Sequence, residues 1–259
     1  MPFKLDMLCR IVTVSHGSER RWFVGSSVAH EAWYPMFTGE VVHVSILKYL
    51  TTLVVGLSLL ATPIQANTSY KLANGTEVHL NGVGEALELN GSLYMGALYL
   101  EHRSATDDVV ATSLWSKRMD IRVTVDKLYG RRFAQHFRER MAINYDRKVL
   151  GSMGKEIQDF VGTFSETLEK GDQVTLDFLP DVGLVIGING KEIKRIPSRA
   201  AFYEALISTW VGQRPPTAQF KDGVLGKANA ETAIDLQKRF FALEPSKTRV
   251  AETNRWAVK

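Results

Sequence analysis

The fold is decided by the stretch Ala86-Leu-Glu-Leu-Asn-Gly-Ser-Leu-Tyr-Met-Gly-Ala-Leu-Tyr-Leu-Glu101. Within it, Asn90-Gly91 supplies the positive φ angles of a tight turn, so residues 86–89 and 92–101 are expected to pair as a hairpin. Successive side chains of a strand point to opposite faces. Both faces of the second strand are apolar, which predicts a strand covered on both sides; they carry Leu93, Met95, Ala97 and Tyr99 on one face, and Tyr94, Gly96, Leu98 and Leu100 on the other.

Outward from this hairpin, the apolar pattern predicts short strands separated by turns, at 76–80, 117–125, 173–179, 184–188 and 191–196. Helical spacing is expected at 128–144, along an apolar stripe from Met153 to Leu168, and at 200–211 and 230–243. Residues 245–259 are polar and are expected to be frayed. Two runs of strands separated by paired helices predict an α+β domain, with an antiparallel sheet and helices layered on one face.

Composition excludes several classes of protein and of site. The 259 residues are 45% apolar and 23% charged, which is typical of a globular chain. The net charge is +4, but the basic residues are scattered along the sequence, so they are only weak evidence for binding to nucleic acid or to an anionic membrane. Cys9 is the sole cysteine, and His79, His102 and His136 have no ligand spacing, so we expect no metal and no other cofactor. Gly82-Val-Gly84 lacks the third glycine of a phosphate loop and favours a bend or bulge.

Residues 1–66 are predicted to be a presequence. Lys48 precedes the apolar run 49–61, and Pro63 and Ala66 follow it, as in a secretory signal cleaved after Ala66. An uncleaved anchor is the alternative, although the run is shorter than the roughly 20 residues that span a bilayer. The signal itself is expected at about 42–66, and residues 1–40 are interpreted as lying upstream of the true start. We therefore expect a periplasmic or secreted protein with no stable membrane anchor after cleavage.

Arg140 is the most informative polar residue of the expected 128–144 helix. At 100° per residue it falls, with Asn144, on the apolar stripe of Phe133 and Phe137. A guanidinium buried without a partner costs several kcal/mol, so something is expected to pair with it. The partner is either a carboxylate or solvent at the domain edge, or the anionic group of a ligand. In the ligand interpretation Tyr94, Tyr99 and Asn144 are further candidates, although the two tyrosines face opposite sides of their strand and a plain core role is open for each.

Several segments resemble the bacterial, secreted chalcone isomerase-like proteins over about 77–226. The resemblance is carried by Leu80-Asn-Gly-Val-Gly84, Leu93-Tyr-Met-Gly-Ala-Leu-Tyr-Leu-Glu101, Gly171-Asp-Gln-Val-Thr-Leu-Asp-Phe-Leu-Pro180, Ile188-Asn-Gly-Lys191, Leu206-Ile-Ser-Thr-Trp-Val-Gly212 and Val224-Leu-Gly226. It implies an open-faced β-sandwich, in which a large antiparallel sheet is backed by helices with a cleft between the layers. The domain is then expected at 67–226, followed by a C-terminal helix and polar tail at 227–259.

The resemblance also carries expectations about chemistry. In the plant enzymes of this superfamily an arginine, a threonine and a tyrosine stabilise developing negative charge. These positions correspond to Ala86, Tyr94 and, less closely, Phe133 in this sequence, so none is kept. Related plastid proteins bind fatty acids without isomerising them and hold the carboxylate with arginine and tyrosine; Arg140 and Tyr94 are candidates for an analogous role by their chemistry rather than by motif.

Three functions are therefore open. The first is non-catalytic binding of a small hydrophobic ligand with a phenolic or carboxylate end, with Arg140, Tyr94, Asn144 and Tyr99 as candidate ligand-binding residues. The second is an isomerase of chalcone isomerase type acting on an enone, against which Ala86 weighs. The third is a cell-envelope interaction protein that has no ligand and docks a protein partner with its C-terminal helix.

Overall fold

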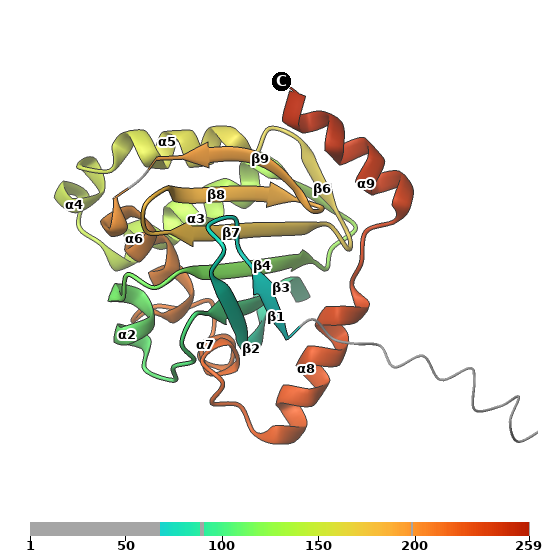
Figure 1. The fold of residues 1–259 in the computed structure, drawn as a ribbon, viewed down its shortest axis with the longest axis horizontal. Helices are drawn as coiled ribbons and strands as arrows, with labels where there is room; N and C mark the ends of the chain where they lie inside the picture. The colour runs from blue at the N-terminus through green and yellow to red at the C-terminus, as the bar shows by residue number, and fades with distance from the viewer. Residues whose placement is uncertain (1–67, 89–90, 198, 259) are drawn as a thin grey trace, which may run out of the picture. The chain divides into compact units, whose positions relative to one another are not determined.

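The computed structural model describes residues 68–88, 91–197 and 199–258. Their central element is a seven-stranded antiparallel sheet with the order β1-β2-β3-β4-β7-β8-β9 (Figure 1). A separate two-stranded ribbon pairs β5 with β6. The strands are β1 (Ser69–Lys71), β2 (Glu77–Glu88), β3 (Gly91–Leu100), β4 (Lys117–Val123), β5 (Lys127–Tyr129), β6 (Thr167–Glu169), β7 (Gln173–Leu179), β8 (Gly183–Ile188) and β9 (Lys191–Ile196).

Helices cover one face of this sheet, and α8 covers part of the other (Figure 1). The helices are α2 (Asp107–Thr112), α3 (Gly130–Asn144), α4 (Arg147–Gly151), α5 (Gly154–Thr163), α6 (Ala200–Val211), α7 (Ala218–Val224), α8 (Ala230–Ala242), α9 (Lys247–Thr253) and the 3-10 helix η1 (Asn254–Val258). The predicted α+β class, an antiparallel sheet backed by a layer of helices, is confirmed.

Strand β3 is covered on both faces, as its sequence predicts. Tyr94 and Leu98 belong to the core beneath the helix layer, whereas Met95 and Tyr99 belong to a second core on the other face, which α8 completes. Leu93 is an exception to the predicted alternation, because it packs against the helix-side core. A register irregularity lies across from it in β2, between Ala86 and Leu87. The expected turn residue Asn90 lies outside the described residues.

The glycines of β2 and β3 allow helix α7 to lie directly on the sheet. A Cβ atom at Gly84 would come within 2.6 Å of the Phe220 carbonyl oxygen, and one at Gly96 within 3.0 Å of the Phe220 ring. The Asn81 side chain also donates a 2.8 Å hydrogen bond to the carbonyl of Val224. The Gly82-Val-Gly84 segment therefore serves close packing of a helix on a strand, and the small residues of β3 leave no void there.

Two helix predictions are wrong in extent. The apolar stripe from Met153 to Leu168 does not form one helix: α5 ends at Thr163, and Leu168 lies in the short strand β6. Phe164 and Leu168 are nevertheless buried in the helix-side core. The helix expected from Leu128 begins instead at Gly130, because 127–129 pair with β6 as strand β5. Apolar spacing located the buried residues correctly but did not distinguish a continued helix from a turn into a strand.

The expectation of a frayed C-terminus is also wrong. Helix α9 is fastened to the sheet by Arg249, of which 7% is exposed. Its Nη2 lies 2.8 Å from Oδ2 of the fully buried Asp172, and its Nε lies 3.1 Å from both carboxylate oxygens. Asn189 donates a 2.8 Å hydrogen bond to the same carboxylate. Two polar residues 77 positions apart therefore fix a segment that has no apolar periodicity of its own.

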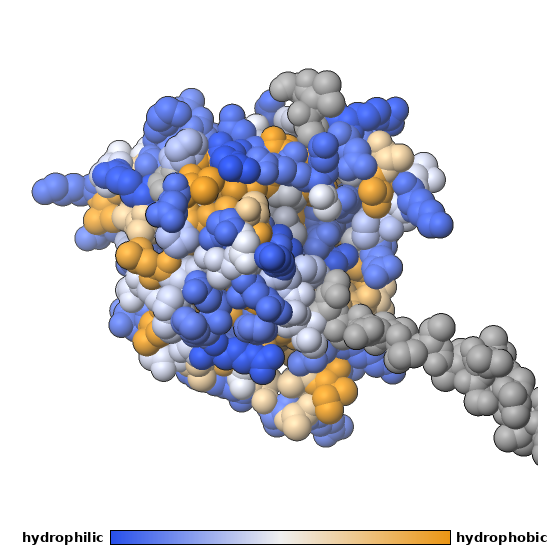
Figure 2. All heavy atoms as spheres, viewed as in Figure 1, coloured by the Kyte–Doolittle hydropathy of each residue, from blue (hydrophilic) through white to orange (hydrophobic). Residues whose placement is uncertain are grey.

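The face of the sheet away from the helix layer carries charged side chains where α8 does not cover it. Hydrophilic residues occupy much of this face, with apolar patches between them (Figure 2). Arg118 and Asp177 form a 2.6 Å ion pair on neighbouring strands there. No helix of the described residues is both long and apolar enough to cross a bilayer, and the expected signal segment lies outside them. The same part of the chain holds no group of three or more side chains that could bind a metal.

Candidate functional site

A pocket of about 250 Å³ opens between helix α3 and the end of strand β2. Arg140 and His136 of α3 line it from one side, and Ala86 of β2 lines it from the other. Its walls are mixed but contain several aliphatic side chains. The full lining is Ala86, Leu87, Glu88, Leu93, His136, Glu139, Arg140, Ile143 and Pro216.

Arg140 is half-buried, and its position in the helix places it beside the core. Phe133, Phe137 and Met141 of the same helix are buried there. Among the described residues, the Arg140 guanidinium takes part in no ion pair, and its buried Nε has no hydrogen-bond partner. Leaving a cation's donor buried and unmatched costs free energy, so this position is suited to an added acceptor.

The two carboxylates that line the pocket are engaged elsewhere. Oε1 of Glu88 lies 3.3 Å from Nδ1 of His136. Oε1 of Glu139 accepts a 3.0 Å hydrogen bond from the Gln135 side chain. Neither carboxylate therefore forms an ion pair with Arg140, and the guanidinium is available to an added anion.

His136 is the residue whose ionisation is coupled to Arg140. Burial lowers the pKa of His136, and the charge of Arg140 lowers it further, while Glu88 opposes the shift. The imidazole is consequently neutral at pH 7. Its Nε2 is buried without a hydrogen-bond partner among the described residues. Sequence reasoning considered His136 only as a metal ligand; its spacing of four residues from Arg140 places both on one face of α3 and was the signal that could have identified it.

Tyr94 lies behind the pocket wall rather than in the pocket. Its ring is fully buried, and its hydroxyl oxygen accepts a 3.0 Å hydrogen bond from the indole N–H of Trp210. Burial raises the pKa of Tyr94 far above its ordinary value, although the Arg140 charge opposes this shift. Tyr94 therefore stays protonated and is close enough to Arg140 to sense its charge.

The structure does not bring the other two candidates into the pocket. Tyr99 faces the second core, where its ring lies 4.9 Å from that of Tyr70. Asn144 donates a 3.0 Å hydrogen bond to the carbonyl of Arg140 and accepts one of 3.1 Å from the backbone N–H of Arg214. Its amide thus joins the end of α3 to the α6–α7 connection, which is a structural role.

Aromatic side chains fill the space between the sheet and the helices where the resemblance implied a cleft. The Tyr94 ring lies 6.0 Å from Phe220 and 6.2 Å from Phe137, which in turn lies 5.1 Å from Trp210. All four side chains are buried. The pocket instead opens at the rim of the layers, beside Ala86, so any ligand there would remain partly in contact with solvent.

Comparison with known proteins finds a family match and a similar solved structure. Residues 62–226, more than half of the chain, match the model of a family described as chalcone isomerase-like. The chain belongs to the chalcone isomerase-like family. A crystal structure of a fatty-acid binding protein from Arabidopsis thaliana is similar in fold, with a TM-score of 0.49 and 15% identity over 66% of this chain and 99% of that chain. No curated protein matches the sequence.

Of the positions at which the resemblance implies charge-stabilising residues, Ala86 lines the pocket of this chalcone isomerase-like chain, and Phe133 does not. Ala86, where the resemblance implies the arginine of the plant enzymes, lines the pocket together with Arg140. Phe133, where the resemblance implies the helix tyrosine, is buried in the helix-side core. The pocket therefore adjoins Ala86, and its cation, Arg140, comes from α3.

Proposed function

We propose that this protein binds a small, largely apolar ligand with an anionic or phenolic end and does not convert it. The observation that carries the proposal is Arg140, a half-buried cation without a carboxylate partner among the described residues, facing a pocket with aliphatic walls. An anionic oxygen bound there would accept hydrogen bonds from the guanidinium, and such charge-assisted bonds are about twice as strong as neutral ones.

The size of the pocket supports a ligand that is only partly enclosed. Ligand sites commonly have volumes of roughly 300 to 1,000 Å³, whereas this pocket has about 250 Å³. Leu87 and Ile143 line it and are themselves 51% and 52% exposed. An apolar ligand body could cover both side chains, which would remove their surface from water and add to the affinity.

The composition of the pocket supports binding rather than turnover. Catalysis of chalcone isomerase type needs groups placed where negative charge develops. Ala86 offers no charge, and the Tyr94 hydroxyl is held by Trp210 behind the pocket wall. An isomerase acting on an enone is the second candidate, because Arg140 shares the pocket with Ala86 and could take over the role of the missing arginine.

Binding can be tested with decanoate as an anionic, apolar probe. Isothermal titration should show a complex with the purified protein, and Arg140→Leu should weaken it roughly ten- to a hundredfold, as expected for loss of a charge-assisted hydrogen bond. Arg138→Leu is the matched control, since Arg138 is exposed on the same helix and does not line the pocket. Absence of binding, or equal loss in both variants, would overturn the proposal.

Turnover can be tested separately. The protein is incubated with a chalcone, and the decrease in the visible absorption of the chalcone is followed over time. This decrease should be no faster with the unmodified protein than with the Arg140→Leu variant. Loss that depends on Arg140 would establish the isomerase and replace the first candidate.

We further propose that the mature protein is periplasmic or secreted and begins after Ala66. The arrangement of Lys48, the apolar run 49–61 and Ala66 supports this location. N-terminal sequencing of the exported protein should begin at Asn67. A mature chain that retains residues upstream of the apolar run would contradict the proposal.

A further inference from the structure

The Arg140 pocket adjoins a second pocket, and we call the two together the groove. A second pocket, of about 210 Å³, shares Glu88 and Leu93 with the first and continues toward the start of α3. The two pockets meet at Glu88 and Leu93, so a ligand that passes over these side chains would reach both. The second pocket is lined by Glu88, Gly91, Ser92, Leu93, Val125, Lys127, Leu128, Tyr129 and Arg132.

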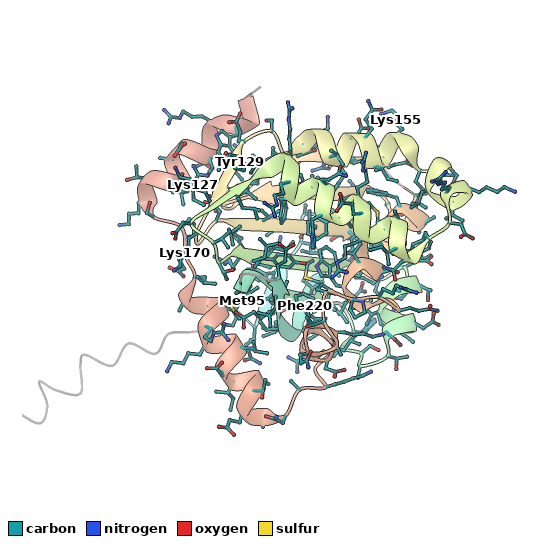
Figure 3. All side chains as sticks on the ribbon, turned by 180° about the vertical axis from the view of Figure 1, so that it is seen from behind. Met95, Lys127, Tyr129, Lys155, Lys170 and Phe220 are labelled. Atoms are coloured by element: carbon teal, nitrogen blue, oxygen red, sulfur yellow. The ribbon has the colours of Figure 1, made fainter. Side chains whose placement is uncertain are left out.

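The far end of this groove carries its own cations. Lys127 precedes α3 in strand β5, and Arg132 lies in the first turn of α3. Seen from the helix side, Lys127 and Tyr129 lie beside the start of α3 (Figure 3). None of the ion pairs formed within the described part of the chain includes Lys127 or Arg132. Each end of the groove therefore carries a cation that forms no ion pair within the described residues, Arg140 at one end and Arg132 with Lys127 at the other.

The spacing of the cations defines a length. Arg132 and Arg140 are eight residues apart on one helix, which at 1.5 Å per residue separates their backbones by about 12 Å along the axis. The middle of the groove is formed by Leu93 together with Glu88. The Glu88 carboxylate lies 3.3 Å from His136 and forms no ion pair with Arg140 or Arg132. An apolar chain that passes over Leu93 therefore need not displace Glu88 from either arginine.

We propose that the ligand class of this groove is an elongated acid with an anionic group at each end and an apolar body between them, as in an α,ω-dicarboxylate. One anionic end binds Arg140 and the other binds Arg132 and Lys127. This inference rests on the proposed binding function and deepens it: a monocarboxylate would use one end of the groove and leave the cations of the other end unpaired.

The test compares decanoate with decanedioate, which differ only in the second carboxylate. By isothermal titration of the purified protein at low salt, decanedioate should bind about tenfold more tightly than decanoate, because a second charge-assisted contact forms. Arg132→Gln, which leaves Lys127 in place, should remove most of this difference and should weaken decanoate much less than decanedioate. Arg138→Gln removes the same charge from α3 outside the groove and should preserve the difference.

The outcomes separate this inference from the proposed function. If decanoate binds and decanedioate binds no more tightly, the two-ended groove is refuted while the Arg140 site stands. If neither acid binds, the proposed function and this inference both fail. If Arg132→Gln weakens both acids equally, with thermal midpoints matching the Arg138→Gln control, the second contact is not made at Arg132 and the inference is overturned.

Discussion

Two arginines in this protein illustrate different uses of a buried cation. Arg249, in α9, is surrounded by partners. Asp172 accepts hydrogen bonds from two of its nitrogens, and carboxylate oxygens of Glu169 and Glu252 lie 3.7 and 3.1 Å from its Nη1. Arg140, in α3, is half-buried, and its Nε has no partner in the part of the chain that the structure describes. The first charge is satisfied by the protein itself, whereas the second faces a pocket.

The difference teaches how to assign a role to each arginine. A matched buried ion pair loses stability when one member is removed, because the other is left buried and uncompensated. A cation that the protein leaves unmatched contributes little to folding and can be removed without such a loss. Stability and binding should therefore respond in opposite ways to the two residues.

The largest effect is expected for Arg249→Leu. It leaves the fully buried carboxylate of Asp172 without its cation, which should lower the free energy of unfolding by about 3–5 kcal/mol. Urea unfolding followed by tryptophan fluorescence would measure the change. Arg140→Leu, under the same conditions, should leave the free energy of unfolding unchanged or raise it. If the two variants are destabilised to the same extent, the distinction between the two arginines is lost.

A smaller effect is expected for Asn144→Ala. The amide joins Arg140 of α3 to Arg214 by hydrogen bonds to main-chain atoms of both residues, so its removal should cost about 1 kcal/mol of stability. Because Asn144 does not line the Arg140 pocket, the affinity for decanoate should change by much less than in Arg140→Leu. A loss of binding as large as that of Arg140→Leu, at an unchanged unfolding midpoint, would restore Asn144 as a ligand-binding residue.

The comparison also separates what local sequence could predict from what it could not. Arg140 was found because helical periodicity placed it among Phe133 and Phe137, and the two faces of β3 were found by alternation. Such patterns involve residues close together in the chain. These local patterns predict the fold class and one wall of the pocket.

Contacts between distant residues were not visible in the same way. Asp172 follows Gly171, which has a φ of +87°, so in sequence it resembles an ordinary turn residue. Its partner Arg249 lies in a polar tail without periodicity, and only the fold brings the two together. The same limit applies to the pocket: Glu88 and His136 come from different elements, and no local pattern predicts that they meet at 3.3 Å.

The smallest predicted effect is a change in the ionisation of His136 when Arg140 is removed. Burial and then the Arg140 charge lower the pKa of His136, so Arg140→Leu should raise that pKa toward its ordinary value. Since the folded-state pKa lies below the unfolded value of about 6.5, the unfolded chain takes up the proton first as the pH falls. Stability is therefore lost below about pH 6.5, and less is lost in Arg140→Leu than in the unmodified protein.

An NMR titration of the His136 ring protons would measure this shift directly, with Arg138→Leu as the control. Arg138 carries the same charge on the same helix but is not among the groups that shift His136, which are Arg140, Glu88, Glu139 and Arg132. The control should therefore leave the His136 pKa in place. Equal shifts in both variants would mean that His136 senses the overall charge of α3, and an unchanged pKa in Arg140→Leu would mean that the guanidinium is turned toward solvent and not held beside the imidazole.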